Sequence, residues 1–191
     1  MDVLGGMDYL QDEGNDPTIV SEGVLDIDFA SDDLEPYDAY YFSEDYFASV
    51  ESEPEGVLVS PNADLAGDVH SVSGVPYETN TVLTDEWVWK EGVFPVFDAH
   101  FEAVLPVSDY HAGSYAHQQT ANEQLLWSYE QNPAQFEDWS DVQIEQLLDG
   151  ETPEGFTWHH HEEMGRMQLV DSDLHGPSSH IGGMSVWGGG Y

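Results

Sequence analysis

The sequence predicts an α+β domain that follows a weakly ordered acidic tail. Short runs of β-branched and aromatic residues lie between residues 75 and 105, and two helical patterns follow between residues 118 and 150. Residues 156–180 then have the pattern strand, loop, strand, helix. A chain of 191 residues has room for one domain with a tail. We expect the tail over residues 1–70 and the domain over residues 71–191.

The N-terminal segment has the composition of a tail or linker. Residues 1–60 contain 17 acidic and no basic residues, and their aromatic residues follow no sustained period. Such a segment buries too little apolar surface to offset chain entropy. We expect it to be largely disordered, with one short helix over residues 37–50. A docking segment with the same composition is the alternative.

The charge of the chain is extreme. There are 39 acidic residues against Lys90 and Arg166, which gives a net charge of −37. One interpretation is a protein adapted to molar salt, where the Debye length is about 3 Å and carboxylate repulsion is screened. The other is a mimic of DNA that binds a basic partner. Apolar residues make up 40% of the chain, so part of it packs a core.

Some classes of protein and site are excluded. No apolar run approaches the roughly 20 residues that cross a bilayer, and no basic residue occurs near the N-terminus, so we expect neither a transmembrane helix nor a signal peptide. The chain has no cysteine, which excludes disulfides, thiolate metal sites and thiol nucleophiles. Any metal is held by His, Asp or Glu.

The first half of the domain is expected to contain short strands and then two helices. The extended segments are residues 75–83, 86–89, 93–97 and 101–105, and the first helix covers residues 118–132. In the second helix Ser140 and Gln143 have capping-box spacing, and Gly150 is placed just past its end.

The second half is expected to form a hairpin and a short helix. Strands over residues 156–161 and 167–170 flank a tight loop, and Asp171 or Ser172 can cap the helix that runs toward His180. The last eleven residues are so rich in glycine that we expect no regular structure there.

Five of the nine histidines fall in this segment: His159, His160, His161, His175 and His180. Alternation along a strand puts His159 and His161 on one face and His160 on the other, unless the strand ends there. His175 and His180 converge only if the helix is broken, for which Gly176-Pro177 is a plausible place.

Imidazole is a common metal ligand and a general base near neutral pH. For a base we expect a ring held by a backbone carbonyl. A solvated strand end and adventitious metal capture are the alternatives for the cluster. The isolated histidines are expected to be solvent-exposed; they are His70, His100, His111 and His117.

The motifs of residues 73–191 resemble the WHH-type nuclease toxin domain of the HNH/endonuclease VII (His-Me finger) superfamily, which occurs in bacterial polymorphic toxins. They are Gly155-Phe156-Thr157-Trp158-His159-His160-His161, Gly165-Arg166-Met167-Gln168-Leu169-Val170, Leu174-His175, His180-Ile181-Gly182-Gly183 and Val186-Trp187-Gly188-Gly189-Gly190. The resemblance extends back through Gly92-Val93-Phe94-Pro95-Val96-Phe97 and Val104-Leu105-Pro106.

The resemblance implies a ββα-metal core that grips one divalent ion, which is Zn, Ni, Mn or Mg. It makes His159, His175 and His180 the metal ligands and His160 the general base. Gln168 lies near the position of the orienting asparagine of HNH enzymes. Arg166 could contact the scissile phosphate or be an ordinary loop arginine, and Trp158 would be a packing residue.

The function implied is a metal-dependent DNA endonuclease, a toxin effector adapted to high salt, although RNA is also a possible substrate. A producer of such a toxin needs an immunity protein, and the toxin is exported to act in the cytoplasm of a target cell. The alternatives are a catalytically inactive acidic binding module, or DNA mimic, that retains the metal-binding core, and a remnant in which metal is only structural.

Overall fold

The computed structural model describes residues 54–190. The acidic stretch 1–53, with the helix expected over residues 37–50, lies outside the described residues. The tail assigned there therefore stays a prediction.

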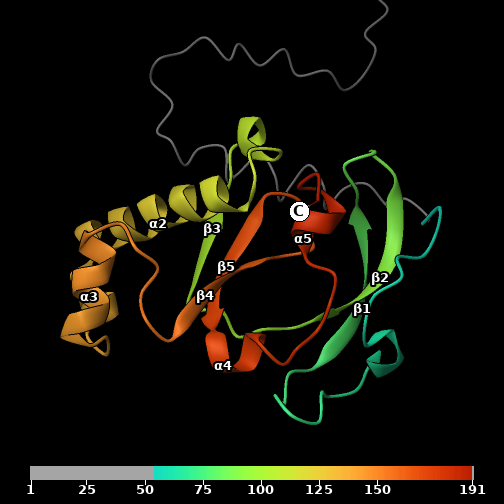
Figure 1. The fold of residues 1–191 in the computed structure, drawn as a ribbon, viewed down its shortest axis with the longest axis horizontal. Coiled ribbons are helices and arrows are strands. Elements are labelled where there is room, and N and C mark those ends of the chain that lie inside the picture. The colour runs from blue at the N-terminus through green and yellow to red at the C-terminus, as the bar shows by residue number, and fades with distance from the viewer. Residues whose placement is uncertain (1–53, 191) are drawn as a thin grey trace, which may run out of the picture. The chain divides into compact units, whose positions relative to one another are not determined.

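Two antiparallel sheets form the β structure of the described residues. Strands β1 (Tyr77–Leu83) and β2 (Trp89–Pro95) make a two-stranded sheet. Strands β3 (Phe101–Val104), β4 (Phe156–His160) and β5 (Arg166–Asp171) make a three-stranded sheet in the order β3-β5-β4. Figure 1 shows the β1–β2 hairpin on one side of this sheet and helices α2 and α3 on the other.

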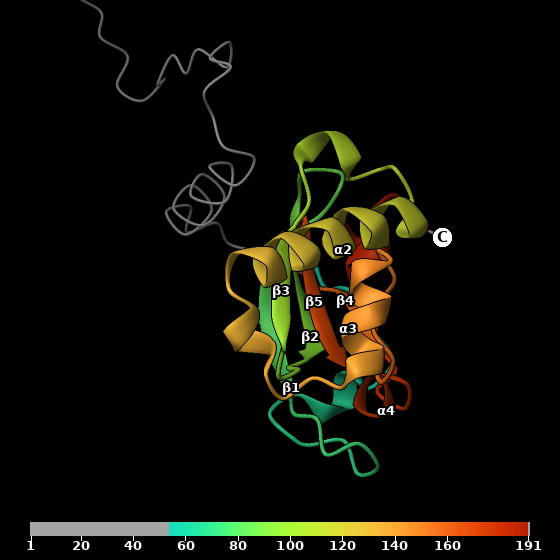
Figure 2. The same ribbon diagram turned by 90° about the vertical axis from the view of Figure 1, so that its left-hand side faces the viewer.

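Four α-helices complete the described part of the chain: α2 (Ser114–Gln131), α3 (Asp141–Leu148), α4 (Ser172–His175) and α5 (Gly183–Val186). Three 3-10 turns are also present among these residues: η1 (Ala63–Leu65) before β1, η2 (Val107–Asp109) between β3 and α2, and η3 (Pro133–Phe136) between α2 and α3. Seen from the side in Figure 2, α2 and α3 cover the three-stranded sheet. The predicted α+β class is confirmed. Within residues 54–190, no helix is both long and apolar enough to cross a membrane.

The predicted helix caps are confirmed. The Ser140 hydroxyl accepts a hydrogen bond from the Gln143 amide, and the Gln143 side chain accepts one from the Ser140 amide, so α3 starts in a full capping box. Gly150 follows the helix with φ 76°, a left-handed conformation that suits glycine. The Asp171 carboxylate accepts hydrogen bonds from two amides at the start of α4. These short-range contacts fix both ends of α3 and the start of α4. We call the segment 156–180, which contains β4, β5 and α4, the hairpin-helix unit.

The strand boundary expected around Gly92 is wrong. Residues 86–89 and 93–97 were expected to be separate extended segments, but β2 runs through Gly92. A Cβ at Gly92 would lie 2.6 Å from Cζ of Phe94, whose ring covers this position. Glycine here makes room for a buried aromatic ring within a strand and does not mark a turn.

The expectation that the glycine-rich C-terminus lacks regular structure is also wrong. Residues 183–186 form α5, and Met184, Val186 and Trp187 are buried. A Cβ at Gly183 would lie 2.1 Å from the His161 carbonyl oxygen, so this glycine permits α5 to approach the end of β4. The close packing of α5 against the end of β4 explains why residue 183 is a glycine.

The packed region begins before residue 71. The amide of Leu58 donates a hydrogen bond to the Glu91 carbonyl at 2.7 Å, and the Leu58 side chain packs against the main core. The Asn62 side chain donates to the Ser179 carbonyl at 2.8 Å. Residues 54–70, which the sequence assigned to the tail, thus contact β2 and the segment after α4.

Candidate metal and catalytic site

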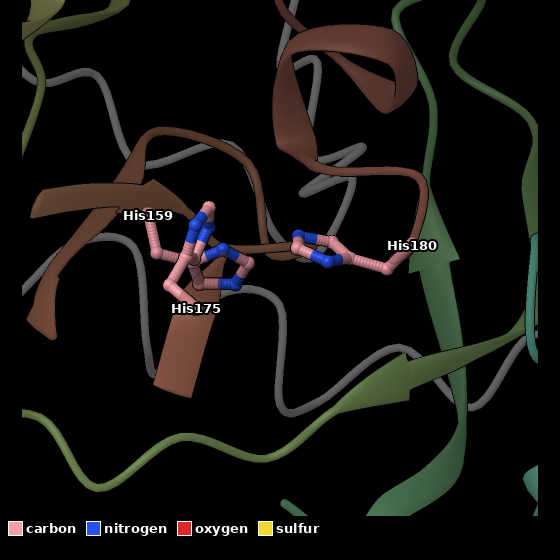
Figure 3. Close-up of side chains that lie close together, drawn as sticks. All are labelled: His159, His175 and His180. Carbon is pink, nitrogen blue, oxygen red and sulfur yellow. The ribbon is translucent and has the colours of Figure 1, made fainter. Parts of the chain in front are cut away.

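Three histidines from the hairpin-helix unit meet at one point. His159, His175 and His180 each offer a ring nitrogen, and these nitrogens all lie within 4.8 Å of one another. Figure 3 shows the three rings turned toward a common centre. His159 lies on β4, and His180 lies on the loop that follows α4. Three imidazoles at this spacing could hold one metal ion.

The chain brings them together by ending its short helix early. His159 lies on β4 and His175 is the last residue of α4. Gly176 and Pro177 follow directly, so the chain turns and His180 returns to the cluster. The predicted break at this dipeptide is confirmed, and it is the reason that two histidines five residues apart can converge.

His159 has the environment of a ligand whose partner is not a protein group. Its ring is buried, and neither Nδ1 nor Nε2 has a hydrogen-bond partner among the described residues. Burial, followed by the neighbouring His180 and His175, holds the pKa of His159 well below its usual range. The ring is therefore neutral near pH 7, and an unpaired buried nitrogen of this kind fits a metal ion.

The two other rings are also prepared to donate lone pairs. The His180 Nδ1–H donates to the Ser178 carbonyl at 2.6 Å, which leaves Nε2 free to bind a metal. Burial lowers the pKa of His180, and the Ser178 hydrogen bond opposes this only in part. Burial and the neighbouring His180 lower the pKa of His175 to about 4.

His160 lines the same pocket as the three-histidine cluster. The pocket has a volume of about 300 Å³ and is open to solvent on one side. Its wall includes His159, His160, His175 and His180. Strand β4 ends at His160, so strict alternation no longer separates it from His159. Burial, His117 and His175 lower the pKa of His160 to about 4, which leaves its ring neutral at pH 7.

A histidine, and not a backbone carbonyl, holds the His160 ring. The His160 Nε2 lies 3.1 Å from Nδ1 of His117, and the His117 Nε2–H donates to the Asp109 carbonyl at 2.7 Å. The expectation that His117 is solvent-exposed is wrong, because its side chain is fully buried. Sequence spacing gives no signal for this pair, since 43 residues separate its members.

Arg166 and Gln168 lie on β5 beside the cluster and share one partner. The Arg166 guanidinium contacts Glu102 at 2.5 Å and Glu163 at 2.7 Å, and the Gln168 amide donates to Glu102 at 2.8 Å. Burial lowers the pKa of Arg166, but its hydrogen bonds with the two glutamates outweigh this and raise it. Gln168 is also the cross-strand partner of His159. Neither residue belongs to the group of rings that could hold the metal.

His161 lies outside the three-histidine cluster. Its Nδ1 accepts a hydrogen bond from the Glu163 amide, and its Nε2 lies 3.5 Å from the buried Glu162 carboxylate. Glu162 in turn accepts a hydrogen bond from the Asn80 side chain at 2.7 Å. This histidine therefore ties the hairpin loop to β1.

Phe97 supports the cluster, and sequence reasoning missed it. Its ring lies 4.9 Å from the His159 ring, 5.3 Å from His175 and 6.0 Å from His180. Phe97 is buried, so it forms an apolar wall against all three rings. Its place in a mixed apolar segment gives no hint of this role, because the contact depends on tertiary packing.

Trp158 is a packing residue, as predicted. Its side chain is buried in the main core, and its indole N–H donates to the Asn122 side chain at 2.7 Å. Asn122 also donates to the Gly150 carbonyl at 3.0 Å. The tryptophan thus joins β4 to α2 and to the turn after α3.

Comparison with known families agrees with this geometry. The family model Colicin-DNase, described as the DNase/tRNase domain of colicin-like bacteriocin, matches residues 86–182. The matched region begins just before β2 and contains the three-histidine cluster and His160. No curated protein and no solved structure matches the chain. The narrower WHH type stays a prediction.

The match covers just over half of the 191 residues, and the hairpin, the short helix and the converging imidazoles that it contains are consistent with an HNH-type nuclease fold. The chain therefore belongs to the Colicin-DNase family and carries a DNase toxin domain.

Proposed function

We propose that the chain is a metal-dependent endonuclease that hydrolyses DNA phosphodiester bonds with one divalent ion. The observation that carries the proposal is the convergence of His159, His175 and His180 on one point, with both nitrogens of His159 unpartnered. The ion would be Zn, Ni, Mn or Mg, and an all-imidazole ligand set favours the first three.

The metal and the pocket have separate tasks in this chemistry. A divalent ion bound here would neutralise charge that develops on the phosphate and on the leaving oxygen. The rings of His159, His175 and His180 hold it from one side, and the open side of the pocket admits the phosphodiester. Phe97 excludes water from the back of the cluster.

His160 is the proposed general base. Its neutral ring takes a proton from a water molecule, and the resulting hydroxide forms a new bond to phosphorus. The bond from phosphorus to the leaving sugar oxygen breaks, and that oxygen takes up a proton from solvent. A pKa of about 4 leaves the ring unprotonated across the neutral range, and it also makes this ring a weaker base than an ordinary imidazole.

Arg166 and Gln168 complete the proposed catalytic set. Glu163 is the more exposed partner of Arg166, and exposed ion pairs contribute only about 0–1 kcal/mol. Exchange of Glu163 for a substrate phosphate would therefore cost little, while Glu102 keeps the guanidinium in place. Gln168 orients the site through Glu102 and as the strand partner of His159.

The biological setting follows from the family and the charge. We propose an exported toxin that acts in the cytoplasm of a target cell, is restrained by a cognate immunity protein, and works at high salt. A net charge of −37 repels DNA at low ionic strength, and screening at molar salt removes most of that repulsion. The part of the acidic segment before residue 54 serves as a tail or linker, while residues 54–70 belong with the domain that the sequence placed at 71–191.

The test is cleavage of supercoiled plasmid by purified protein. Metal-free protein is supplied with Zn, Ni, Mn or Mg in turn, at KCl concentrations from dilute to molar, and single-stranded RNA is assayed in parallel. We expect nicking that needs a divalent ion, disappears with chelator and is slowed by about a hundredfold or more in His160→Ala. His100→Ala is the matched control. His100 is exposed, and its ring lies against Phe156 at the start of β4, whereas His160 lies at the end of that strand. No nicking in any condition, or equal nicking by His160→Ala, overturns the proposal.

The charge also favours a second candidate, an inactive acidic module that mimics DNA. Both basic residues of the chain, Lys90 and Arg166, are paired with glutamates, so the described surface has no unpaired Lys or Arg to offer DNA. If the chain is such a module, it should bind a basic nucleic-acid-binding protein. Alanine substitution of His159 or His160 should leave this binding unchanged. It fails if the plasmid assay gives His160-dependent cleavage.

A further inference from the structure

We propose that His117 is a positioning residue that sets the tautomer and orientation of the general base His160. The inference rests on the proposed function for its catalytic meaning, but its structural content can be tested separately. It starts from the hydrogen-bonded chain that runs from the Asp109 carbonyl through His117 to His160.

The Asp109 carbonyl determines which group donates in each of these two hydrogen bonds. The Asp109 carbonyl oxygen can only accept, so the His117 Nε2 that lies 2.7 Å away must carry a proton. A His117 ring with one proton then has a lone pair on Nδ1. The His160 Nε2, 3.1 Å from that lone pair, must be the donor. A neutral His160 is left with its lone pair on Nδ1.

Nδ1 is therefore the nitrogen of His160 that accepts the proton from water. It has no hydrogen-bond partner among the described residues, whereas Nε2 is committed to His117. His160 also lines the open pocket next to the three-histidine cluster. In free imidazole both tautomers are populated, so a fixed acceptor on one nitrogen selects the competent form.

The surroundings keep this pair rigid and dry. His117 is fully buried in the first turn of α2, and the rings of His117 and His160 lie 5.2 Å apart. The Trp187 indole packs against both, at 5.8 Å from His117 and 6.0 Å from His160. Water cannot easily replace His117 as the partner of Nε2, so the tautomer depends on this one side chain.

Two amide substitutions at His117 distinguish its hydrogen bond with His160 from its hydrogen bond with the Asp109 carbonyl. In His117→Asn the side-chain oxygen lies near the former Nδ1 and can still accept from His160. In His117→Gln the amide reaches toward the former Nε2 and the Asp109 carbonyl, without the acceptor for His160. His117→Leu removes both hydrogen bonds, and His100→Leu is the control at an exposed histidine.

The experiment combines plasmid-cleavage kinetics, metal affinity and nitrogen NMR of histidine-labelled metal-free protein. We expect His117→Leu to lower kcat by about tenfold to a hundredfold, part of what a general base contributes, with unchanged KM and metal affinity. His117→Asn keeps more activity than His117→Gln. In a His160→Ala background, His117→Leu has no further effect on kcat, because His117 acts through His160.

The NMR spectrum tests the structural claim without reference to activity. Wild-type His160 should carry its proton on Nε2, and His117→Leu should populate the form with the proton on Nδ1. A wild-type proton on Nδ1, an unchanged tautomer in His117→Leu, or a loss of activity that persists in the His160→Ala background overturns the inference. If the wild type cleaves nothing, the proposed function fails, and the spectrum of the wild type still decides the tautomer.

Discussion

The indole N–H of Trp187 donates a hydrogen bond to the backbone carbonyl of His161 at 2.8 Å. This bond ties the segment after α5 to the residue that follows β4, one position past His160. The amide of His161 donates to the Arg166 carbonyl at 3.0 Å, so the same residue also closes the hairpin. The C-terminal tryptophan therefore fixes the end of the strand that supplies the candidate ligand and base.

Trp187→Phe should lower the free energy of unfolding by about 1–3 kcal/mol. Phenylalanine keeps an aromatic ring in the core but has no N–H, so the His161 carbonyl loses a buried partner. Urea titration followed by circular dichroism measures the change. Trp87→Phe, at an exposed turn position, is the control and should leave the free energy of unfolding nearly unchanged. Equal stabilities of the two variants would contradict the role of the hydrogen bond.

Gly183→Ala should be destabilising by about 1–3 kcal/mol, the usual cost of overpacking. The new Cβ would lie 2.1 Å from the His161 carbonyl oxygen and 2.4 Å from Nε1 of Trp187, so α5 must move away from β4. Gly56→Ala is the control, because no atom lies within 4 Å of its Cβ position. A thermal melt that shows no difference between the two variants would rule out the close contact.

A divalent ion should raise the melting temperature of metal-free protein. Binding to the folded state alone stabilises by about 2.7 kcal/mol when the ion is at about 100 times its Kd. His175→Ala and His180→Ala each remove one ring of the three-histidine cluster and should lose most of this gain. His100→Ala should keep it. Differential scanning fluorimetry with Zn, Ni and Mn gives the comparison, and an equal rise in all variants would place the ion elsewhere.

The stability of metal-free protein should fall as the pH is lowered from about 6.5 to about 4. The pKa of His160 and of His175 is about 4 in the folded protein, below the ordinary value near 6.5 in an unfolded chain. In that window the unfolded state binds more protons, so acid favours unfolding; above it both states are neutral.

His175→Ala isolates one of these groups. It should flatten the slope of unfolding free energy against pH by up to about one proton, because the carboxylates titrate in both proteins. Urea titrations between pH 4 and pH 7 measure both slopes. A variant slope that matches or exceeds that of wild type would show that His175 does not carry this linkage.

Potassium chloride should stabilise the fold. Raising it from about 0.1 M to about 1 M shortens the Debye length from about 10 Å to about 3 Å and screens repulsion within a chain of net charge −37. We expect the melting temperature to rise through this range. Sucrose at equal osmolality, which screens no charge, should give a smaller rise. A flat or falling melting temperature in KCl would exclude adaptation to salt.

Local signals predicted much of the fold. The capping box at Ser140, the Asp171 cap and the Gly176-Pro177 break depend on neighbours within a few residues, and all three occur in the structure. Together with the strand pair 156–160 and 166–171, the Asp171 cap and the Gly176-Pro177 break account for the hairpin-helix unit. The spacing of the histidines left their convergence open, and the resemblance to the WHH-type domain named the three that meet, His159, His175 and His180.

The sequence pattern could not predict contacts between segments that are far apart in the chain. Gly92 was interpreted as part of a boundary between two strands, and residues 181–191 as too rich in glycine for regular structure. In the structure Gly92 and Gly183 each make room for a side chain or backbone group that only the folded chain brings near. His117 was expected at the surface because nothing beside it suggested burial. Its partner His160 lies on another element, so no local pattern could disclose the pair.

The three converging rings come from a stretch of only residues 159–180, which contains the end of β4, strand β5, the single helical turn of α4 and the loop after it. Closing so short a loop costs little chain entropy, and the cost grows only slowly with loop length. An ion that engages these rings would therefore act on a unit able to form before β3 or the β1–β2 hairpin docks. The refolding rate, and not only the equilibrium, should then respond to metal, with a faster folding limb when the ion is present from the start.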